Sequence, residues 1–301
     1  MTHPERFSYQ LADRHDVREP FRSALVALSL RGEDKDALMV FSPAIDTTAG
    51  TTAASVLVVD AEGWHLICEE ESGMSTVAAS FARSALVEMT IVLLLGRLKI
   101  DYVGRNQVRT VVVEFNTVME PLYHELVQRL LTGMDGGTIT APPEPPDRSA
   151  DIGLLHSMPL KFRNAVLRFV PPGERILAAT YWPAIVLQRN NLIENEISPE
   201  SALILCEHEL MLVSAERLIP EDRATQHYRI GLVNKHGSIA VHGRLSRLHE
   251  FRFGGFGHAL TLDLLFRIDP AIEILTVAFP ESQRAVVVDL MRQALRQKRG
   301  G

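Results

Sequence analysis

The chain has 301 residues, of which 46% are hydrophobic and 23% charged, and its formal net charge is −6. This length suits two domains with cores of their own, while the acidic balance argues against nucleic acid and against general attraction to anionic membranes. Two cysteines cannot form a disulfide framework, the charged N-terminus is no signal peptide, and no apolar run could span a bilayer, so we expect a cytoplasmic protein.

The first predicted elements follow a polar tail over residues 1–19. Residues 23–30 and 37–42 are apolar runs joined by the polar turn RGEDKD, a pattern that predicts a β-hairpin. Residues 46–54 are small and polar, which predicts a loop.

A second hairpin is predicted from residues 55–60 and 64–68, which flank a glycine turn. Residues 84–96 fit either a buried helix or a strand, and the alternation in residues 98–103 favours a strand in their later part. Residues 108–115 give the clearest strand signal of this half.

The clearest helix begins after this strand. Thr117 and Glu120 have capping-box spacing, Pro121 suits a first turn, and Gly133 is expected to end the helix. The apolar stripe expected to face a sheet consists of Val118, Leu122, Leu126 and Leu130, with Tyr123 and Val127 beside them.

Residues 134–156 form the predicted linker between two domains. Prolines and glycines crowd its first part, MDGGTITAPPEPPDRSA, which favours a stiff, extended chain without regular structure.

The second half gives a similar series of signals. Its predicted strands are residues 165–170, 176–181, 202–205, 210–214, 228–233, 237–241, 248–253, 260–268 and 271–279. Residues 187–200 are interpreted as a long loop, and residues 254–257 (GGFG) as a glycine turn. The last helix begins near Pro280, with Val286, Leu290 and Leu295 on its apolar side, and its basic end is expected to fray.

One string of the sequence occurs twice. FRSALVALSLRGEDKDALMVFSPAI (residues 21–45) returns as FRNAVLRFVPPGERILAATYWPAI (residues 162–185), with the same opening, the same Gly-Glu and the same Pro-Ala-Ile ending. Residues 86–88 also match residues 248–250, and Val-x-Phe precedes both helices. We infer two copies of a unit with about seven short strands and one C-terminal helix, which is an α+β, mostly β, arrangement.

Each copy resembles the pleckstrin-homology-like superfold, including its bacterial and GRAM-like relatives. The resemblance rests on the opening hairpin, the run of antiparallel strands, and the endings VEFNTVMEPLYHELVQRLL and VAFPESQRAVVVDLMRQAL. It implies two barrel-like domains, residues 20–133 and 157–298, each with a bent antiparallel sheet and a helix that plugs one open end.

Catalytic motifs are incomplete in this sequence. GGFG does not complete a dinucleotide-binding loop, and a phosphate-binding GxxxxGK[ST] motif does not occur. His124 and Glu125 lack the second histidine of HExxH, since position 128 is Gln128, and GxSxG is absent. We therefore predict no catalytic residue and no cofactor.

Several histidines and acids of the second half could in principle meet a metal ion. They are His236, His242, His249, His258, Glu250 and Asp263. Their spacings match no ligand template, so surface or hairpin histidines are favoured over a metal site. Cys68 and Cys206 are expected to be free thiols, and Trp64 and Trp182 to be core residues.

The two opening turns test a lipid-binding role. Lipid-binding members of the superfold are expected to grip phosphates with clustered Lys and Arg in this turn. Glu33, Asp34 and Asp36 offset Arg31 and Lys35 in the first turn, and Glu174 offsets Arg175 in the second. The acids therefore disfavour binding of a lipid headgroup, and we expect the charged residues of both turns to be exposed at the surface.

These observations favour a non-enzymatic tandem interaction or scaffold module. We expect it to bind a protein partner or itself through sheet edges and the surface between the domains. The residues expected at such a surface are Gly254, Gly255, Phe256, Gly257, Asn190 and Asn191. The alternatives are a lipid or membrane-surface adaptor that uses the basic residues 296–299, and a metal-dependent enzyme that uses the histidines above.

Overall fold

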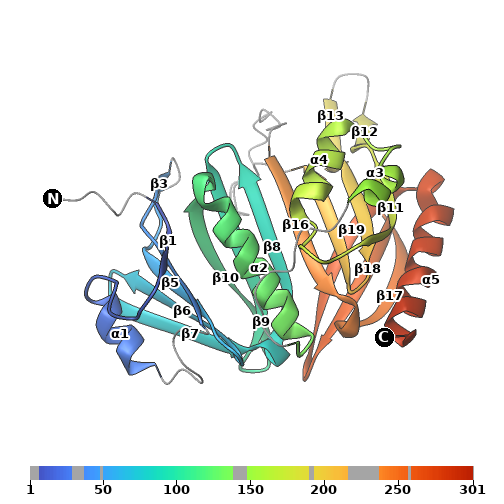
Figure 1. Ribbon diagram of the computed structural model, residues 1–301. Helices are drawn as coiled ribbons and strands as arrows, with labels where there is room; N and C mark the ends of the chain where they lie inside the picture. Colours follow the sequence, from blue (N-terminus) through green and yellow to red (C-terminus); the bar gives the residue numbers. More distant parts are fainter. Residues whose placement is uncertain are drawn as a thin grey trace.

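The structure is a computed structural model that describes residues 7–28, 37–47, 50–137, 148–189, 193–215, 237–256 and 259–300. In this part of the chain the fold is α+β and mostly β, as expected, with antiparallel sheets and a C-terminal helix (Figure 1). The expected turn at residues 31–36 and the expected strand at residues 228–233 lie outside the described residues.

The N-terminal half contains a five-stranded sheet with the order β1-β2-β5-β6-β7. Its strands are β1 (Tyr9–Leu11), β2 (Leu38–Ser42), β5 (Ser55–Val59), β6 (Gly63–Glu70) and β7 (Gly73–Ser80). Between them lie helix α1 (Phe21–Ala27) and the short pair β3 (Asp46–Thr47) and β4 (Gly50–Thr51). The chain continues with β8 (Ser84–Val92), β9 (Leu95–Gly104), β10 (Gln107–Asn116) and helix α2 (Glu120–Met134).

The C-terminal half opens with helices α3 (Ser149–Leu154) and α4 (Leu160–Phe169). Its first strands are β11 (Ile176–Trp182), β14 (Ser201–Cys206), β15 (Glu209–Ala215) and β16 (Gly237–Arg244), and β12 (Ile185–Arg189) pairs with β13 (Ile193–Ser198) as a separate hairpin. A three-stranded sheet follows, formed by β17 (Leu248–Phe256), β18 (Ala259–Ile268) and β19 (Ala271–Pro280), before helix α5 (Arg284–Gly300).

The two halves share one sheet. Strand β8 of the first half pairs antiparallel with β16 of the second, from Gly237 opposite Val92 to Gly243 opposite Leu86. The result is a seven-stranded sheet with the order β10-β9-β8-β16-β15-β14-β11. The halves are therefore joined through backbone hydrogen bonds as well as through the chain between them.

From α1 and α4 onward, both halves also follow the same order of elements. From β7 and β16 onward, matched elements recur at a constant spacing in the sequence: the 3₁₀ turn η2 (Phe81–Arg83) corresponds to η4 (Leu245–Arg247), and β8 corresponds to β17. The repeated string at residues 21–45 and 162–185 likewise has one helix and one strand in each copy.

Irregularities of the strands fall at matched positions as well. A β-bulge interrupts the pairing of β8 with β9 between Ser84 and Leu86, and another interrupts β17 and β18 between Leu248 and Glu250. Leu248 therefore corresponds to Ser84, so the expected match between residues 86–88 and residues 248–250 was wrong.

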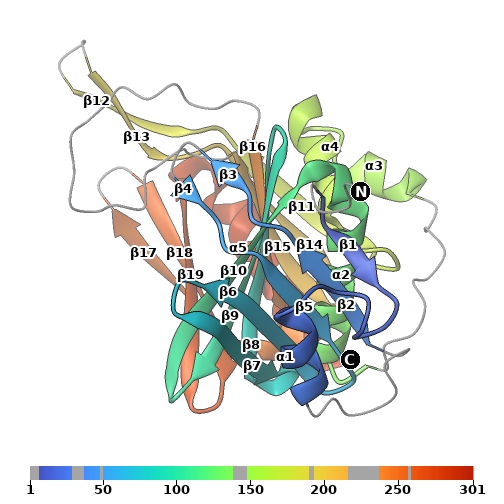
Figure 2. The ribbon, with the colours of Figure 1, turned by 90° about the vertical axis from the view of Figure 1, so that its left-hand side faces the viewer.

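Apolar clusters separate the layers of the molecule. One surrounds α2, between the five-stranded and seven-stranded sheets, and continues under α4. A second fills the space between the opposite face of the seven-stranded sheet, the three-stranded sheet and α5. A third lies between α1 and the five-stranded sheet, and Figure 2 shows α1 in front of these strands. In this way α1 and α4 each cover the first sheet of their own half.

Helices α1 and α4 contradict the strands expected at residues 23–30 and 165–170. Phe21 and Leu25 are buried one helical turn apart, and Phe162, Val166 and Phe169 follow the same spacing. This is a period of 3.6 residues, and short apolar runs do not separate it from a buried strand. The opening hairpin of each copy is therefore a helix followed by a strand.

The predicted hairpins at residues 55–68 and 202–214 are confirmed, as are the strands at residues 98–103, 108–115 and 260–279. Residues 84–92 form a strand throughout, which settles the helix-or-strand alternative.

Other expectations were wrong. Part of the expected loop at residues 187–200 belongs to the hairpin of β12 and β13, and most of the expected GGFG turn belongs to β17. Strand β7 was not predicted, because most of its residues are small and only Met74 and Val77 are strongly apolar. Helix α3 occupies part of the predicted linker.

The helix stripes are confirmed only in part. Val118 and Val286 are exposed, whereas Tyr123 is buried as expected, and Val287 rather than Val286 points into the core. Gly133 lies within α2, where a Cβ atom would collide with the ring of Phe81, so this glycine permits close packing rather than ending the helix.

Residues 296–299 are helical, contrary to the frayed end that we expected. Trp64 and Trp182 are fully buried, as expected. Cys68 and Cys206 are free thiols, although Cys68 is only half-buried.

Candidate functional site

The surface between the halves is built around helix α2, which contacts the second half at both of its ends. At the N-terminal end, Arg168 of α4 forms an ion pair with Glu120, and His124 lies 3.0 Å from the same carboxylate. The ring of His124 also lies 6.0 Å from that of Phe169. Burial raises the pKa of Glu120, but hydrogen bonds with His124 and Arg168 outweigh it and lower this pKa to about 2.

At the C-terminal end of α2, a residue that follows β16 donates hydrogen bonds to the last turn of the helix and to its neighbours. Arg247 donates to the carbonyl oxygens of Phe81, Ala82 and Met134, each at 2.9 Å. A guanidinium group suits this position, because the last carbonyls of a helix are unpaired and carry a partial negative charge. Burial lowers the pKa of Arg247.

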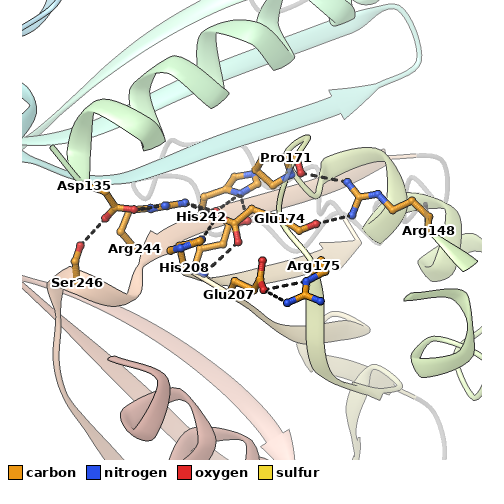
Figure 3. A network of polar contacts seen from close by, with 11 residues as sticks. Asp135, Arg148, Pro171, Glu174, Arg175, Glu207, His208, His242, Arg244 and Ser246 are labelled. Carbon is orange, nitrogen blue, oxygen red and sulfur yellow. Dashed lines mark hydrogen bonds and ion pairs between the residues drawn. The ribbon is translucent and has the colours of Figure 1, made fainter. Parts of the chain in front are cut away.

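Arg244 is the centre of a buried polar network beside this helix end (Figure 3). Its Nε donates to Asp135 at 2.6 Å, and Ser246 donates to the second oxygen of Asp135 at 2.7 Å. On the other side, its Nη1 lies 3.1 Å from Glu174 and 3.7 Å from Glu209. A single guanidinium group therefore faces three carboxyl groups.

His242 completes the network. Its Nδ1 lies 3.3 Å from Glu209, and the exposed fractions of the two side chains are 1% and 0%. Burial and the charge of Glu209 raise the pKa of Glu174, against the opposing effects of Arg244 and His208. The cluster therefore has more acids than cations and is shielded from water. Removal of one ionic partner from such a site costs stability, because it leaves the other charge buried and unpaired.

Glu174 was expected to be an exposed acid in a surface turn, and the structure contradicts this. The side chain is buried, and it accepts hydrogen bonds from the backbone of His208 and from Arg244. Arg148 binds the backbone of the same turn through the carbonyls of Val170, Pro171 and Glu174. The turn is thus a structural support of the junction, which no pattern in the sequence signalled.

Two strands whose counterparts form the β8–β16 pairing lie at open sheet edges among the described residues. Strand β7 corresponds to β16, and β17 corresponds to β8. Strand β7 is an edge of the five-stranded sheet, and β17 is an edge of the three-stranded sheet. Thr76 and Ala78 on β7 are exposed, while Phe251 and Phe253 on β17 are half-buried and their rings pack together at 5.5 Å. Such edges present unpaired backbone groups to an incoming strand.

Of the residues expected at an interaction surface, Gly254, Gly255 and Phe256 belong to β17 and thus to one of these open edges. Gly257, Asn190 and Asn191 lie outside the described residues.

An open cleft of about 460 Å³ lies at one end of the five-stranded sheet. Glu69, Glu70 and Glu71 line one side of it, and Arg18 forms an ion pair with Glu69 at 2.6 Å. Ser75 donates to Glu70 at 2.5 Å. These acids repel anionic ligands, and Glu69 and Glu70 are paired with neighbours rather than arranged around a nucleophile.

The histidines considered for a metal site are dispersed. His242 is buried against Glu209 and His249 is exposed, whereas His236 and His258 fall outside the described residues. Glu250 pairs with Arg252 at 2.9 Å, and Asp263 accepts from Thr276 at 2.7 Å. Within the residues that the structure describes, no three His, Cys, Asp or Glu side chains gather as metal ligands.

No protein-family model matches the chain, and no curated protein matches it. None of the helices in the described part of the chain is both long and apolar enough to cross a membrane. The junction and the open sheet edges are therefore the features from which we infer a function.

Proposed function

We propose that this chain is a non-enzymatic interaction module, built from two pleckstrin-homology-like units, that binds protein partners by strand addition at open sheet edges. The order of elements supports the resemblance, because each half passes through a first sheet, three further strands and a closing helix. The composition supports a cytoplasmic location.

The pairing of β8 with β16 is the observation that carries this proposal. Here an edge of one unit already binds an edge of the other, over the register from Gly237 to Gly243. Strand addition is therefore a mode of binding that these units use within the chain, and β17 is the strand that corresponds to β8.

The composition of β17 suits the same role. Gly254 and Gly255 allow another backbone to approach closely, and Phe251 and Phe253 offer apolar surface beside the edge. Main-chain hydrogen bonds would supply affinity, and the two rings would select apolar side chains on the incoming strand.

The alternative functions have weaker support. A membrane-surface adaptor would rely on the basic residues 296–299 of α5, while the cleft acids Glu69–Glu71 favour cations instead. A metal-dependent enzyme that used His242 would have to withdraw this side chain from its buried contact with Glu209. Strand addition requires no such rearrangement of the core.

Selection of peptides from a random displayed library against the immobilised full chain tests the proposal. We expect enrichment of extended peptides with alternating apolar residues, and we expect these peptides to slow amide hydrogen exchange in β17. Failure to enrich any peptide, or protection that maps to the cleft instead of a sheet edge, would contradict the proposal.

Two matched variants serve as controls. Gly255→Asp places a charge on β17, where an added Cβ meets no atom closer than 4.0 Å in the folded chain. Ile272→Asp places the same charge on β19, the other edge of the same sheet, at an exposed position. Only Gly255→Asp is expected to abolish peptide binding, so equal effects of the two variants would count against β17.

A further inference from the structure

The junction inside the chain leaves two matched strands unpaired among the described residues. Strand β8 has its partner in β16, but β17, which corresponds to β8, has an open edge. Strand β7, which corresponds to β16, has an open edge too. In Figure 1 the two open strands lie on opposite sides of the molecule, so they cannot pair within one chain.

We propose that the chain assembles head to tail, with β17 of one copy paired antiparallel to β7 of the next copy. This inference rests on the proposed function of the open edges, and it names a second copy as the partner. The contact would repeat, between chains, the β8–β16 pairing that already exists inside each chain. The lengths agree, because β7 and β16 have 8 residues each while β17 and β8 have 9.

The register of the new contact follows from the register inside the chain. Gly243 lies opposite Leu86 in the junction. The matched residues are Ala79 on β7 and Glu250 on β17, so these two should lie opposite each other. Ala240 lies opposite Met89 in the junction, and the matched residues are Thr76 and Phe253, so these two should also lie opposite each other.

The side chains at these positions are compatible with pairing. In the junction, Val241 lies opposite Glu88, and the matched pair is Val77 opposite Arg252. On the other face, Thr76 would cover the ring of Phe253, which one copy alone leaves half-buried. The new contact thus repeats the pairing of an apolar residue with a charged one, and it buries aromatic surface.

Strand β7 also lacks the features that protect sheet edges. Its sequence, GMSTVAAS, contains no charged residue and no proline over 8 residues. Long edge strands of this kind usually carry lysine, proline or a bulge that prevents pairing with another chain. An edge without them is suited to accept a strand.

Arg83 gives a second, independent reason. It corresponds to Arg247, which binds the carbonyl groups of Phe81 and Ala82 across the junction. Arg83 is exposed and has no hydrogen-bond or ion-pair partner among the described residues. In the assembled form, it should reach the carbonyl groups of Leu245 and Ser246 in the preceding copy.

Such a contact joins two different surfaces, so it does not close after two copies. Repetition of the same step produces either a ring or an open filament, according to the rotation between copies. Each added copy leaves one β7 edge and one β17 edge free for the next.

Disulfide trapping tests the register directly. In a Cys68→Ser background, Ala79→Cys and Glu250→Cys introduce one cysteine on each open strand. Opposite residues of antiparallel strands have the Cα separation that a disulfide needs. We expect mild oxidation to yield a ladder of dimers, trimers and larger species on a non-reducing gel.

The matched control combines Ala78→Cys with Glu250→Cys in the same background. A shift by one residue places the two sulfur atoms on opposite faces of the joined sheet, so this pair should not form the ladder. Equal crosslinking by both pairs, or no crosslinking by the first pair, would overturn the proposed register.

Light scattering over a wide range of concentration provides a measurement without crosslinks. The native chain should increase in mean mass with concentration, and Thr76→Asp should weaken this association at least about tenfold, because it places a charge against Phe253. Val112→Asp, at an exposed position of the edge strand β10, should have no effect.

The outcomes separate this inference from the proposed function. A chain that remains monomeric at all concentrations but still binds selected peptides on β17 would overturn self-assembly and leave strand addition intact. Loss of both activities would contradict the two proposals together.

Discussion

The paired edge of β16 and the open edge of β7 occupy the same place in the two halves, but their side chains differ. Glu209 on β15 lies opposite Arg244 on β16, and at the matched positions Gly63 lies opposite Ser80. His242 likewise corresponds to Ala78 on β7. The edge that is occupied inside the chain therefore carries buried ionic groups, whereas the matched open edge is neutral.

This difference separates permanent contacts from reversible ones. Loss of one partner from a buried ionic cluster is costly, so the charges around Arg244 hold the two halves in one arrangement. A neutral edge gains only backbone hydrogen bonds and modest side-chain burial, which suits a contact that forms and dissociates. We therefore expect the outer contact to be weaker than the junction.

Removal of the central cation should have the largest effect. Arg244→Met leaves Asp135, Glu174 and Glu209 without their shared partner, so we expect a loss of about 3–5 kcal/mol in the free energy of unfolding, measured with urea. Ser80→Ala, at the matched exposed position, should change it by less than about 0.5 kcal/mol. A small loss in Arg244→Met would show that the cluster does not hold the halves together.

The two matched arginines should differ in kind. Arg247→Ala removes three hydrogen bonds to backbone carbonyls, so we expect a loss of about 2 kcal/mol in stability. Arg83→Ala should leave stability unchanged and reduce concentration-dependent association several-fold, as measured by light scattering. Equal destabilisation of the monomer by Arg83→Ala and Arg247→Ala would contradict the claim that Arg83 acts only between chains.

A smaller effect should appear in the dependence of stability on pH. The pKa of Glu174 is raised above its ordinary value of 4.5, so the folded state retains this proton longer than the unfolded state does. The group therefore lowers stability as the pH rises from 4.5 through its folded pKa. Glu174→Gln should make the curve flatter in this range, and an unchanged curve would mean that folding does not raise the pKa of Glu174.

Much of the β structure could be predicted from the sequence, because alternation and hairpin turns are local signals. The strands around Gly63 and the strand at residues 108–115 are examples. Helix α1 could not be separated from a strand, because its short apolar run fits both periods. Strand β7 is positioned by its pairing with β6, and its mostly small residues alone predict little.

The candidate site was predictable only where local chemistry marked it. The glycines of β17 attracted attention as a possible interaction surface, although they were interpreted as a turn. Glu174 also stood out, but as an exposed acid. The pairing of β8 with β16 joins residues that are far apart in the sequence, so no local pattern indicated which edges would be filled.

Amide hydrogen exchange at several protein concentrations can distinguish the permanent β8–β16 pairing from reversible pairing of β7 with β17, because it reports on all four strands at once. We expect β8 and β16 to be protected at every concentration, whereas outward-facing amides of β7 and β17 should exchange rapidly in dilute solution and become protected as the concentration rises. Exchange in β7 and β17 that does not change with concentration would contradict it.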